Sequence, residues 1–548
     1  MKLRIPLLSV LILISVSAIA QPISFSWAKA LGGKTSNANN ITMARDAGGA
    51  VYLLGEFVGT RTFDSYSLTS SGTSSIFVAK YSASGNCLWA VKGGYNFSSA
   101  GAGRITVNGS AVYITGTFTN FFEMGSLAVI SNGSNDVYIA SLNTSDGSPI
   151  WLEKAGSASE DFGVGICNAS TGGVYICGTF TGTSAFGTNT IATTSAIDND
   201  IFYAHYNASG VCTWAKRMGG PEYDKAFFIK ETPTGDLVLT GSYEGQAQFG
   251  SVYLQSAGYA DYFLVKTNSS GIVTWAVSGG GDNTDIGHAV SFDPAGNIYS
   301  TGFIADTAVF GSITLLNALN VNILLTKHNS AGVCQWARTA GNINSDVAYD
   351  IVTDAGGSSY ITGYVTGDAD FSGTTLVGVI IQDGFVAKYD NAGNLRWVTK
   401  VGGVNTETGK AIHLDSNGYC FIAGDFDGTF NVTGVPSITA ATGTYSVYFM
   451  RMGGGSVGID EAGENLFSVY PNPASDFIQL NLAFINDDIF SLELIDVTGK
   501  IVYNEKLTQI HNLSSKTIST LNLQNGTYFL RVSSSKGEIT KPVVVNHK

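Results

Sequence analysis

Short runs of apolar, β-branched and aromatic residues recur along the chain, and each run is closed by Gly, Asn, Ser or Asp. Examples are residues 113–116 and 385–388. Runs of a few residues bounded by turn formers are typical of β-strands. The 548 residues include 67 Gly, 25 Tyr and 30 Phe, and only 13% of them are charged. The pattern predicts an all-β protein that is too long for one ordinary hydrophobic core.

The runs repeat every 61 to 63 residues, and every Trp of the chain marks this period. These residues are Trp27, Trp89, Trp151, Trp214, Trp275, Trp336 and Trp397. In the same phase, short runs end in Gly, as at residues 52–55 and 360–363. Aromatic runs are entered by an acid in several units, at Asp136, Asp200, Asp261 and Asp383. Each unit therefore contains about four predicted strands and no helix.

A unit of this size forms a small antiparallel sheet that cannot cover both of its faces, so neighbouring sheets must stack. Radial stacking gives a β-propeller, whereas an open β-solenoid has shorter repeats and parallel strands. The two ends of the repeat region are complementary. Residues 25–29 form a Trp-marked strand with no unit before it, and the last unit stops after the strand at 447–451. Pairing of these two strands would close the ring and cover two open sheet edges.

With its Asp-x-x-Gly turns and Tyr-x-x-Gly strands, the stretch 23–452 resembles the bacterial secreted β-propeller repeat family. The resemblance implies a seven-bladed β-propeller. We assign it to residues 21–452, closed by the N-terminal strand. The resemblance brings no catalytic motif with it.

The N-terminus combines Lys2 and Arg4 with an apolar run up to residue 16 and the sequence Ala18-Ile19-Ala20. These are the parts of a cleaved signal peptide at residues 1–20, and the run is shorter than the roughly 20 residues that span a bilayer. We therefore expect no transmembrane segment in the mature chain. The net charge of −13 and the lack of a basic block argue against nucleic acid as a partner.

The composition changes after Gly453, which indicates a Gly-rich linker at residues 453–464 and a second domain at 465–548. Alternating runs at 477–482, 491–496 and 527–532 predict a small Ig-like β-sandwich there. Its turns and strand starts carry a set of motif residues: Pro471, Asn472, Pro473, Asp476, Gly499, Lys500, Gly526 and Tyr528.

Through these motifs the tail closely resembles the C-terminal sorting domain (type A) of the type IX secretion system. The resemblance implies that the type IX secretion machinery is a partner and that the chain passes through the periplasm of a Gram-negative bacterium. It further implies an extracellular or outer-membrane-surface location. If the tail is removed after export, we expect cleavage in the linker between Gly453 and Glu464.

One position of the repeat carries an acid in five successive units. The residues are Asp161, Asp224, Asp285, Asp346 and Glu407, and the two earliest units have Asn37 and Ser99 there. In a propeller this loop enters the innermost strand, so the side chains would ring one mouth of the central channel. Such a collar would attract a cation or a basic ligand. Alternatively, each acid accepts hydrogen bonds from the backbone amides of its own loop.

No other motif points to chemistry. The sequence predicts no Gly-x-Ser-x-Gly elbow at a strand-to-helix turn, and its Cys and His residues lack zinc spacing. We therefore predict no catalytic residue, no metal site, and no cofactor apart from a cation bound in the channel. Cys167 and Cys177 flank a predicted hairpin, where they would either bridge or remain core thiols.

The leading functional hypothesis is a surface-displayed or released propeller that binds a carbohydrate or a protein through the loops of one face. Loop aromatic residues that would either stack on sugars or pack between blades are Tyr95, Phe97, Phe121, Phe122 and Tyr223. One alternative is a polysaccharide-active hydrolase or lyase with its site at the channel mouth. Another is a structural or adhesive surface component.

Overall fold

The computed structural model describes most of the chain. The described residues are 25–31, 40–71, 74–94, 100–195, 198–316, 320–379, 381–403, 405–432, 435–440, 445–453, 468–470, 474–481, 489–497, 499–506, 515–534 and 537–547. They form strands and turns without a helix, and they belong to two compact units, Ile23–Gly455 and a second that contains Ser456–Lys548. A helix with the length and apolarity needed to cross a membrane does not occur among them. The signal peptide predicted at 1–20 and the linker predicted at 453–464, Gly453 excepted, lie outside them.

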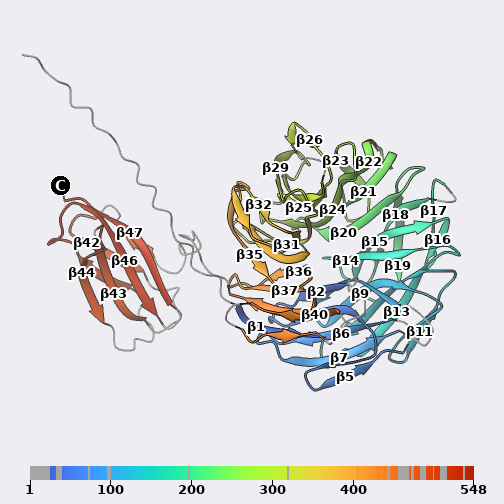
Figure 1. Cartoon of the computed structure of the whole chain (residues 1–548), viewed down its shortest axis with the longest axis horizontal. Coiled ribbons are helices and arrows are strands. Elements are labelled where there is room, and N and C mark those ends of the chain that lie inside the picture. Colours follow the sequence, from blue (N-terminus) through green and yellow to red (C-terminus); the bar gives the residue numbers. More distant parts are fainter. Residues whose placement is uncertain are drawn as a thin grey trace, which may run out of the picture. The chain divides into compact units, whose positions relative to one another are not determined.

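The first unit is a circle of small antiparallel sheets (Figure 1). From the innermost to the outermost strand, the sheets are β2 (Ile41–Arg45), β3 (Val51–Phe57), β6 (Ser75–Tyr81) and β7 (Cys87–Gly93); β8 (Ala100–Asn108), β9 (Ala111–Phe118), β12 (Asp136–Asn143) and β13 (Pro149–Gly156); β14 (Phe162–Asn168), β15 (Val174–Thr181), β18 (Asn199–Tyr206) and β19 (Cys212–Met218); β20 (Asp224–Glu231), β21 (Leu237–Phe249), β22 (Val252–Thr267) and β23 (Val273–Gly279); β24 (Ile286–Phe292), β25 (Ile298–Ile304), β28 (Asn322–His328) and β29 (Cys334–Ala340); β30 (Val347–Thr353), β31 (Ser359–Thr366), β34 (Gln382–Tyr389) and β35 (Leu395–Val401); and β36 (Glu407–Leu414), β37 (Cys420–Asp427), β40 (Tyr445–Met452) and β1 (Phe25–Ala30).

Short hairpins follow the second strand in six of these sheets. They are β4–β5 (Thr60–Phe63, Tyr66–Thr69), β10–β11 (Phe121–Met124, Leu127–Ile130), β16–β17 (Thr183–Phe186, Asn189–Ala192), β26–β27 (Ala308–Phe310, Ile313–Leu315), β32–β33 (Ala369–Phe371, Thr374–Leu376) and β38–β39 (Thr429–Phe430, Ile438–Thr439). In the remaining sheet the hairpin is continuous with the long strands β21 and β22. The repeat therefore contains more strands than the four that the sequence predicts.

The N-terminal strand completes the last sheet. β1 pairs antiparallel with β40, with Ala30 opposite Tyr448 and Trp27 opposite Arg451. Each innermost strand contacts the innermost strand of the next sheet, and β36 contacts β2, so the row of sheets returns to its start. The predicted pairing of residues 25–29 with 447–451 is thus confirmed. The antiparallel ladders exclude a parallel β-solenoid.

The repeated Trp residues join neighbouring sheets. Nε1 of Trp151 in β13 donates a hydrogen bond of 3.0 Å to the carbonyl oxygen of Ala208, in the outer hairpin turn of the next sheet. Gly210 in that turn has a φ of +83°, and a Cβ on it would lie 2.9 Å from the Trp151 ring. Trp89, Trp275 and Trp336 make equivalent bonds, each to a carbonyl oxygen in the outer hairpin turn of the following sheet. The period of the Trp residues therefore reflects contacts between sheets.

The second unit consists of two sheets around one core. One sheet contains β41 (Ser468–Tyr470), β42 (Phe477–Asn481) and β45 (Ser515–Ser519), and the other contains β44 (Ile501–Lys506), β43 (Ile489–Asp496), β46 (Gly526–Ser534) and β47 (Gly537–Val545). Ile478 and Ile518 of the first sheet and Leu492 and Leu530 of the second are buried in the shared core. The unit is therefore a small β-sandwich.

Several residues of the sorting motif have clear structural roles. The Tyr528 hydroxyl donates a hydrogen bond of 2.9 Å to the carbonyl oxygen of Gln524. Gly499, at a φ of +87°, closes the turn before Lys500 by donating to the carbonyl oxygen of Asp496. The carbonyl oxygen of Asp476 accepts a bond from the Thr520 amide, and Gly526 begins β46. Pro471, Asn472 and Pro473 lie outside the described residues.

Candidate functional site

Six of the seven innermost strands are interrupted by a β-bulge at the same place, where one or two residues have no partner on the next strand. The bulged residue of each strand lines a single cavity: Arg104 in β8, Val164 in β14, Phe227 in β20, His288 in β24, Tyr349 in β30 and Lys410 in β36. The seventh innermost strand, β2, pairs regularly and contributes Ile41 and Thr42. Bulges often redirect a side chain beside a functional site, and here they aim six side chains at the middle of the ring.

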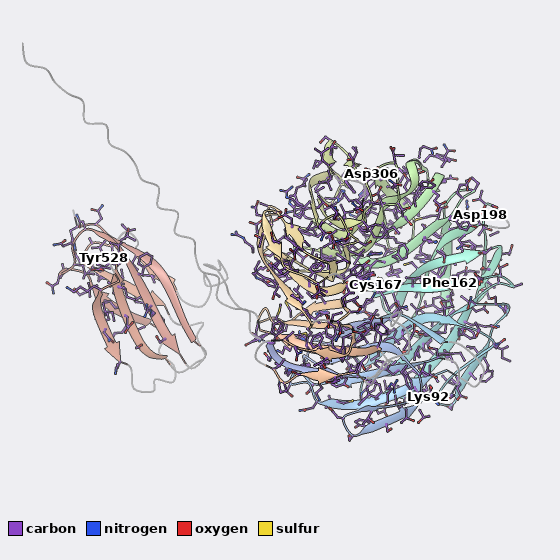
Figure 2. The ribbon with its side chains drawn as sticks, viewed as in Figure 1. Lys92, Phe162, Cys167, Asp198, Asp306 and Tyr528 are labelled. Atoms are coloured by element: carbon purple, nitrogen blue, oxygen red, sulfur yellow. The ribbon has the colours of Figure 1, made fainter. Side chains whose placement is uncertain are left out.

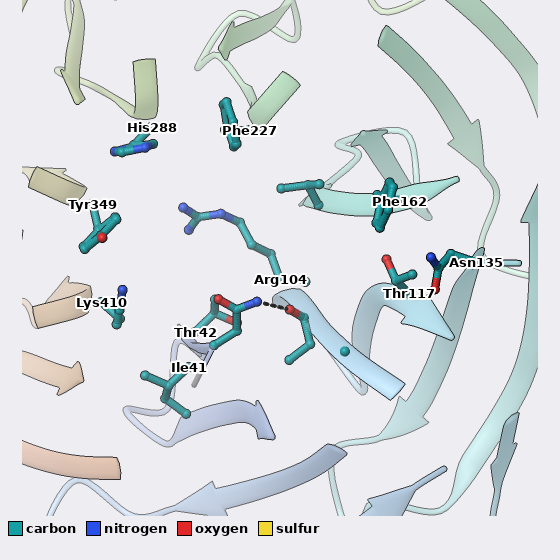
Figure 3. A pocket seen from close by; sticks show the side chains of 16 residues that line it. Ile41, Thr42, Arg104, Thr117, Asn135, Phe162, Phe227, His288, Tyr349 and Lys410 are labelled. Atoms are coloured by element: carbon teal, nitrogen blue, oxygen red, sulfur yellow. Dashed lines mark hydrogen bonds between the residues drawn. The ribbon is translucent and has the colours of Figure 1, made fainter. Parts of the chain in front are cut away.

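The cavity has a volume of about 490 Å³. Its size lies within the range of about 300–1,000 Å³ that is usual for small-molecule sites. In Figure 3 the Arg104 side chain extends into its middle, and Phe227, His288, Tyr349 and Lys410 stand around it. Phe162, Thr117 and Asn135 line another side. The site therefore combines aromatic faces with a few polar groups, as ligand pockets do.

The two ionic groups of the lining are both cations. Arg104 and Lys410 line the cavity, and no carboxylate does so within the described part of the chain. Nη1 of Arg104 lies 3.7 Å from Oδ1 of Asp350 on β30, and its Cζ lies 4.2 Å from the Phe228 ring centroid. Nζ of Lys410 lies 3.7 Å from the centroid of Tyr349. Burial lowers the pKa of both cations, and Asp350 and Asp425 oppose this effect. A negative ligand would find positive charge that is partly stripped of water.

His288 and Tyr349 are neutral neighbours of these cations. Nδ1 of His288 is 2.9 Å from the carbonyl oxygen of Ala348 and donates to it, which leaves the lone pair on Nε2. Its ring centroid lies 5.2 Å from that of Tyr349. Burial, together with the charges of Lys410 and Arg104, lowers the pKa of His288 to about 4. Burial raises the pKa of Tyr349 to about 12.

The five acids predicted to form a collar lie three residues before the bulged residues, and each is completely buried. The amide of the residue four positions earlier donates to the acid at Asp161, Asp224, Asp285 and Asp346, with distances of 2.6, 2.7, 2.8 and 2.7 Å. In Glu407, neither carboxylate oxygen has a hydrogen-bond partner among the described residues. The four Asp carboxylates therefore order the loops that lead into the innermost strands. The five acids do not present a charged surface to the channel mouth, and in this the structure differs from the expected collar.

Most of these acids face a second acid across a glycine. A Cβ on Gly219 would lie 2.6 Å from Oδ1 of Asp200 and 2.6 Å from Oδ2 of Asp224. Gly156 lies in the same way between Asp136 and Asp161, and Gly280 between Asp261 and Asp285. Burial is the main cause that raises the pKa of Asp224 and Glu407 to about 8, of Asp285 to about 7 and of Asp346 to about 6. Asp224 and Glu407 are therefore largely protonated at neutral pH.

The remaining candidate residues have other surroundings. Cys167, labelled in Figure 2, and Cys177 are buried free thiols, so they do not form a bridge. Phe122 is buried and stacked on Tyr138, whereas Tyr223 is 45% exposed. Tyr95 and Phe97 lie outside the described residues. Within the described ranges, no group of three or more His, Cys, Asp or Glu is arranged to hold a metal ion.

Comparison with known proteins agrees with this architecture. The sequence is 23% identical over 442 residues to an uncharacterized WD repeat-containing protein of Acanthamoeba polyphaga mimivirus, and the match covers 66% of this chain. It spans only 32% of that relative's length. With its circle of repeated antiparallel sheets, the chain is a β-propeller repeat protein.

The tail gives the second part of the identification. Residues 468–546 match the family described as the secretion system C-terminal sorting domain. The chain is thus a propeller that carries a type IX sorting tail, which implies export to the cell surface or the extracellular space.

Similar solved structures match the chain with low TM-scores. The quinohemoprotein alcohol dehydrogenase of Comamonas testosteroni has a TM-score of 0.36 and 10% identity, covering 83% of this chain and 79% of its own. The Trypanosoma rangeli sialidase in complex with sialic acid has a TM-score of 0.30 and 8% identity, covering 96% of this chain and 87% of its own. Scores this low do not bear on the ligand or the activity.

Proposed function

We propose that the protein is an exported binding module, a seven-bladed propeller that takes an acidic carbohydrate into the cavity formed by the bulged residues. The observation that carries this proposal is the pair Arg104 and Lys410, placed among aromatic side chains in a lining whose described residues include no carboxylate. Cations bind the carboxylate or sulfate groups of acidic sugars, and aromatic faces pack against sugar rings. A concave site favours a sugar residue over the flat surface of a folded protein.

The seven sheets among the described residues support the blade count, and the contact between β36 and β2 supports a closed ring. The two-sheet core of the tail supports an Ig-like sandwich at 465–548. We propose the boundaries 21–452 for the propeller and 453–464 for the linker.

Binding can be tested with soluble uronate polymers. We expect polygalacturonate or alginate to bind by isothermal titration calorimetry, and a neutral β-glucan not to bind. Lys410→Met should weaken binding about tenfold or more, because a charge-assisted hydrogen bond is lost. Lys225→Met is the matched control, since Lys225 is an exposed lysine on the innermost strand β20 outside the lining, and it should leave the affinity within about twofold.

Equal binding of the neutral and acidic polymers would exclude the proposed ligand class. An unchanged affinity in Lys410→Met would exclude the cavity as the site. If no glycan binds at all, the structural or adhesive role would be favoured.

Export through the tail is tested by deleting residues 465–548 in a bacterium that has a type IX system. The full chain should reach the surface or the medium, and the deleted form should remain in the periplasm. Mass spectrometry of the exported form should find a C-terminus between Gly453 and Glu464. An exported form that still contains Tyr528 would contradict the expected cleavage.

A further inference from the structure

Four side chains with complementary chemistry meet in the cavity, each from a different sheet. They are Arg104, His288, Tyr349 and Lys410, and all four are bulged residues of innermost strands. The His288 and Tyr349 rings are in contact range, with centroids 5.2 Å apart, and the Lys410 ammonium lies over Tyr349. Binding alone needs the cations and the aromatic faces. It gives no reason for a neutral imidazole whose Nδ1 is anchored to the Ala348 carbonyl.

We propose that the cavity cleaves a uronate-containing polysaccharide by β-elimination, with His288 as the base and Tyr349 as the acid. This inference rests on the proposed binding of an acidic carbohydrate. Arg104 and Lys410 hold the uronate carboxylate and stabilise the negative charge that develops on it when the neighbouring carbon loses its proton.

The reaction balances without a cofactor. Nε2 of His288 takes the proton from C5 of the uronate, and the electron pair of that C–H bond forms the C4=C5 double bond. The bond between C4 and the glycosidic oxygen breaks, and the Tyr349 hydroxyl gives its proton to the departing oxygen. The imidazolium then returns a proton to the tyrosinate, directly or through water. The products are a saccharide with a free hydroxyl and a saccharide that ends in a 4,5-unsaturated uronate.

The protonation states suit these roles. The pKa of His288 is lowered to about 4 and that of Tyr349 is raised to about 12, so at neutral pH the base is free and the acid carries its proton. Groups whose surroundings drive their pKa values apart are the usual acid and base of an active site. Lys410 and Arg104 are two of the causes that lower the pKa of His288. A bound carboxylate would offset both charges and make the imidazole a stronger base.

Elimination fits the cavity better than hydrolysis does. Hydrolysis of a glycosidic bond ordinarily requires two carboxyl groups on either side of that bond. The described residues of the lining provide none, and Asp350 is already held by the Ile412 amide and lies beside Arg104. Such a hydrolase would not need Arg104 and Lys410. An elimination needs these cations to stabilise the charge on the uronate carboxylate.

The test follows the ultraviolet absorbance of the conjugated double bond while the protein is incubated with polygalacturonate, alginate and hyaluronan. We expect absorbance to rise with at least one of the polymers. His288→Gln keeps an amide that can donate to Ala348, and it should lower kcat about 100-fold or more while the affinity for the polymer stays within about threefold. Tyr349→Phe should lower kcat in the same way, and Lys225→Met should have no effect.

The pH profile gives a readout that a purely structural role of His288 would not produce. The titratable groups around His288 are Tyr349, Lys410 and Arg104. For the wild type, kcat/KM should rise with pH as His288 loses its proton and become level above about pH 5. The residual activity of His288→Gln should lack this limb.

Polymer binding without any rise in absorbance would overturn the elimination and leave the binding proposal standing. Absence of binding would overturn both. Elimination that persists in His288→Gln at the wild-type rate would remove His288 from the mechanism.

Discussion

Replacing Gly219 by Ala is expected to destabilise the propeller by about 3 kcal/mol or more. Gly219 has a φ of +138°, and a Cβ there would lie 2.6 Å from oxygens of both Asp200 and Asp224. Neither carboxylate is free to withdraw. Oδ2 of Asp200 is bound to Arg217 at 2.7 Å, and Oδ2 of Asp224 accepts the Gly220 amide at 2.7 Å. Making room for the methyl group would therefore break buried hydrogen bonds of both side chains.

Gly172→Ala is the matched control, because Gly172 also has a positive φ, of +96°, but a Cβ there would meet no atom within 4 Å. This variant should lose only the free energy that a positive φ costs an Ala backbone, about 1–2 kcal/mol. Urea unfolding of the two variants separates the backbone strain from the contact with the carboxylates. Equal losses of stability would mean that the acid pair does not constrain Gly219.

The sequence predicted the repeat well because its markers act locally. A Trp that packs on the hairpin glycine of the next unit, such as Trp151 on Gly210, must recur once per sheet, so its spacing reveals the number of sheets and their order. The complementary ends of the repeat region also predicted the pairing of β1 with β40. Both inferences require only the period and the phase of the chain.

The cavity was not predicted, because its residues share a position without sharing a chemical type. His288, Tyr349 and Lys410 are equivalent by fold, yet a search for recurring residue types passes over them. The signal was present three residues earlier, at the acids Asp285, Asp346 and Glu407. In a repeat protein, a position that varies beside constant neighbours is therefore a candidate site. The side chain at this position points to the axis because of the bulge, and the bulge depends on strand register rather than on composition.

The acids were expected at a channel mouth because their loop enters the innermost strand, and the alternative was that each acid accepts hydrogen bonds from the amides of its own loop. Their burial depends on contacts that the chain order does not show. The partner acids Asp136, Asp200 and Asp261 mark the start of a different strand of the repeat, and the fold brings the two acids of each pair to one glycine. The sequence contains both series of acids, but only the packing of the sheet shows that they meet.

This burial leads to the second large effect, which is a dependence of stability on pH. The pKa of Asp224 is raised to about 8 by burial and by Asp200, whereas an Asp in the unfolded chain has a pKa near 3.9. Between about pH 4 and pH 8 the folded state therefore binds more protons than the unfolded state, and the free energy of unfolding falls as the pH rises. Asp224→Asn removes this titration while keeping an oxygen that accepts from the Gly220 amide.

We expect Asp224→Asn to be as stable as the wild type near pH 4 and more stable at pH 8.5 by on the order of a few kcal/mol. The difference between the two proteins is the quantity to measure, because the buried histidines His288, His328 and His413 act in the opposite direction. Burial lowers their pKa to about 4, so below about pH 6.5 they make stability rise with pH. Both proteins contain these histidines, and their contribution cancels in the difference.

Glu407→Gln should behave in the same way, since burial raises the pKa of Glu407 to about 8 as well. Glu407 enters β36 and Asp224 enters β20, in sheets that are not neighbours, so the two gains should add in the double variant. Asp146→Asn is the control, because this exposed acid has its pKa lowered by bonds to Ser148 and should gain nothing at high pH. An advantage of Asp224→Asn that stays constant from pH 5 to pH 8.5 would show that the pair does not hold a proton in the folded protein.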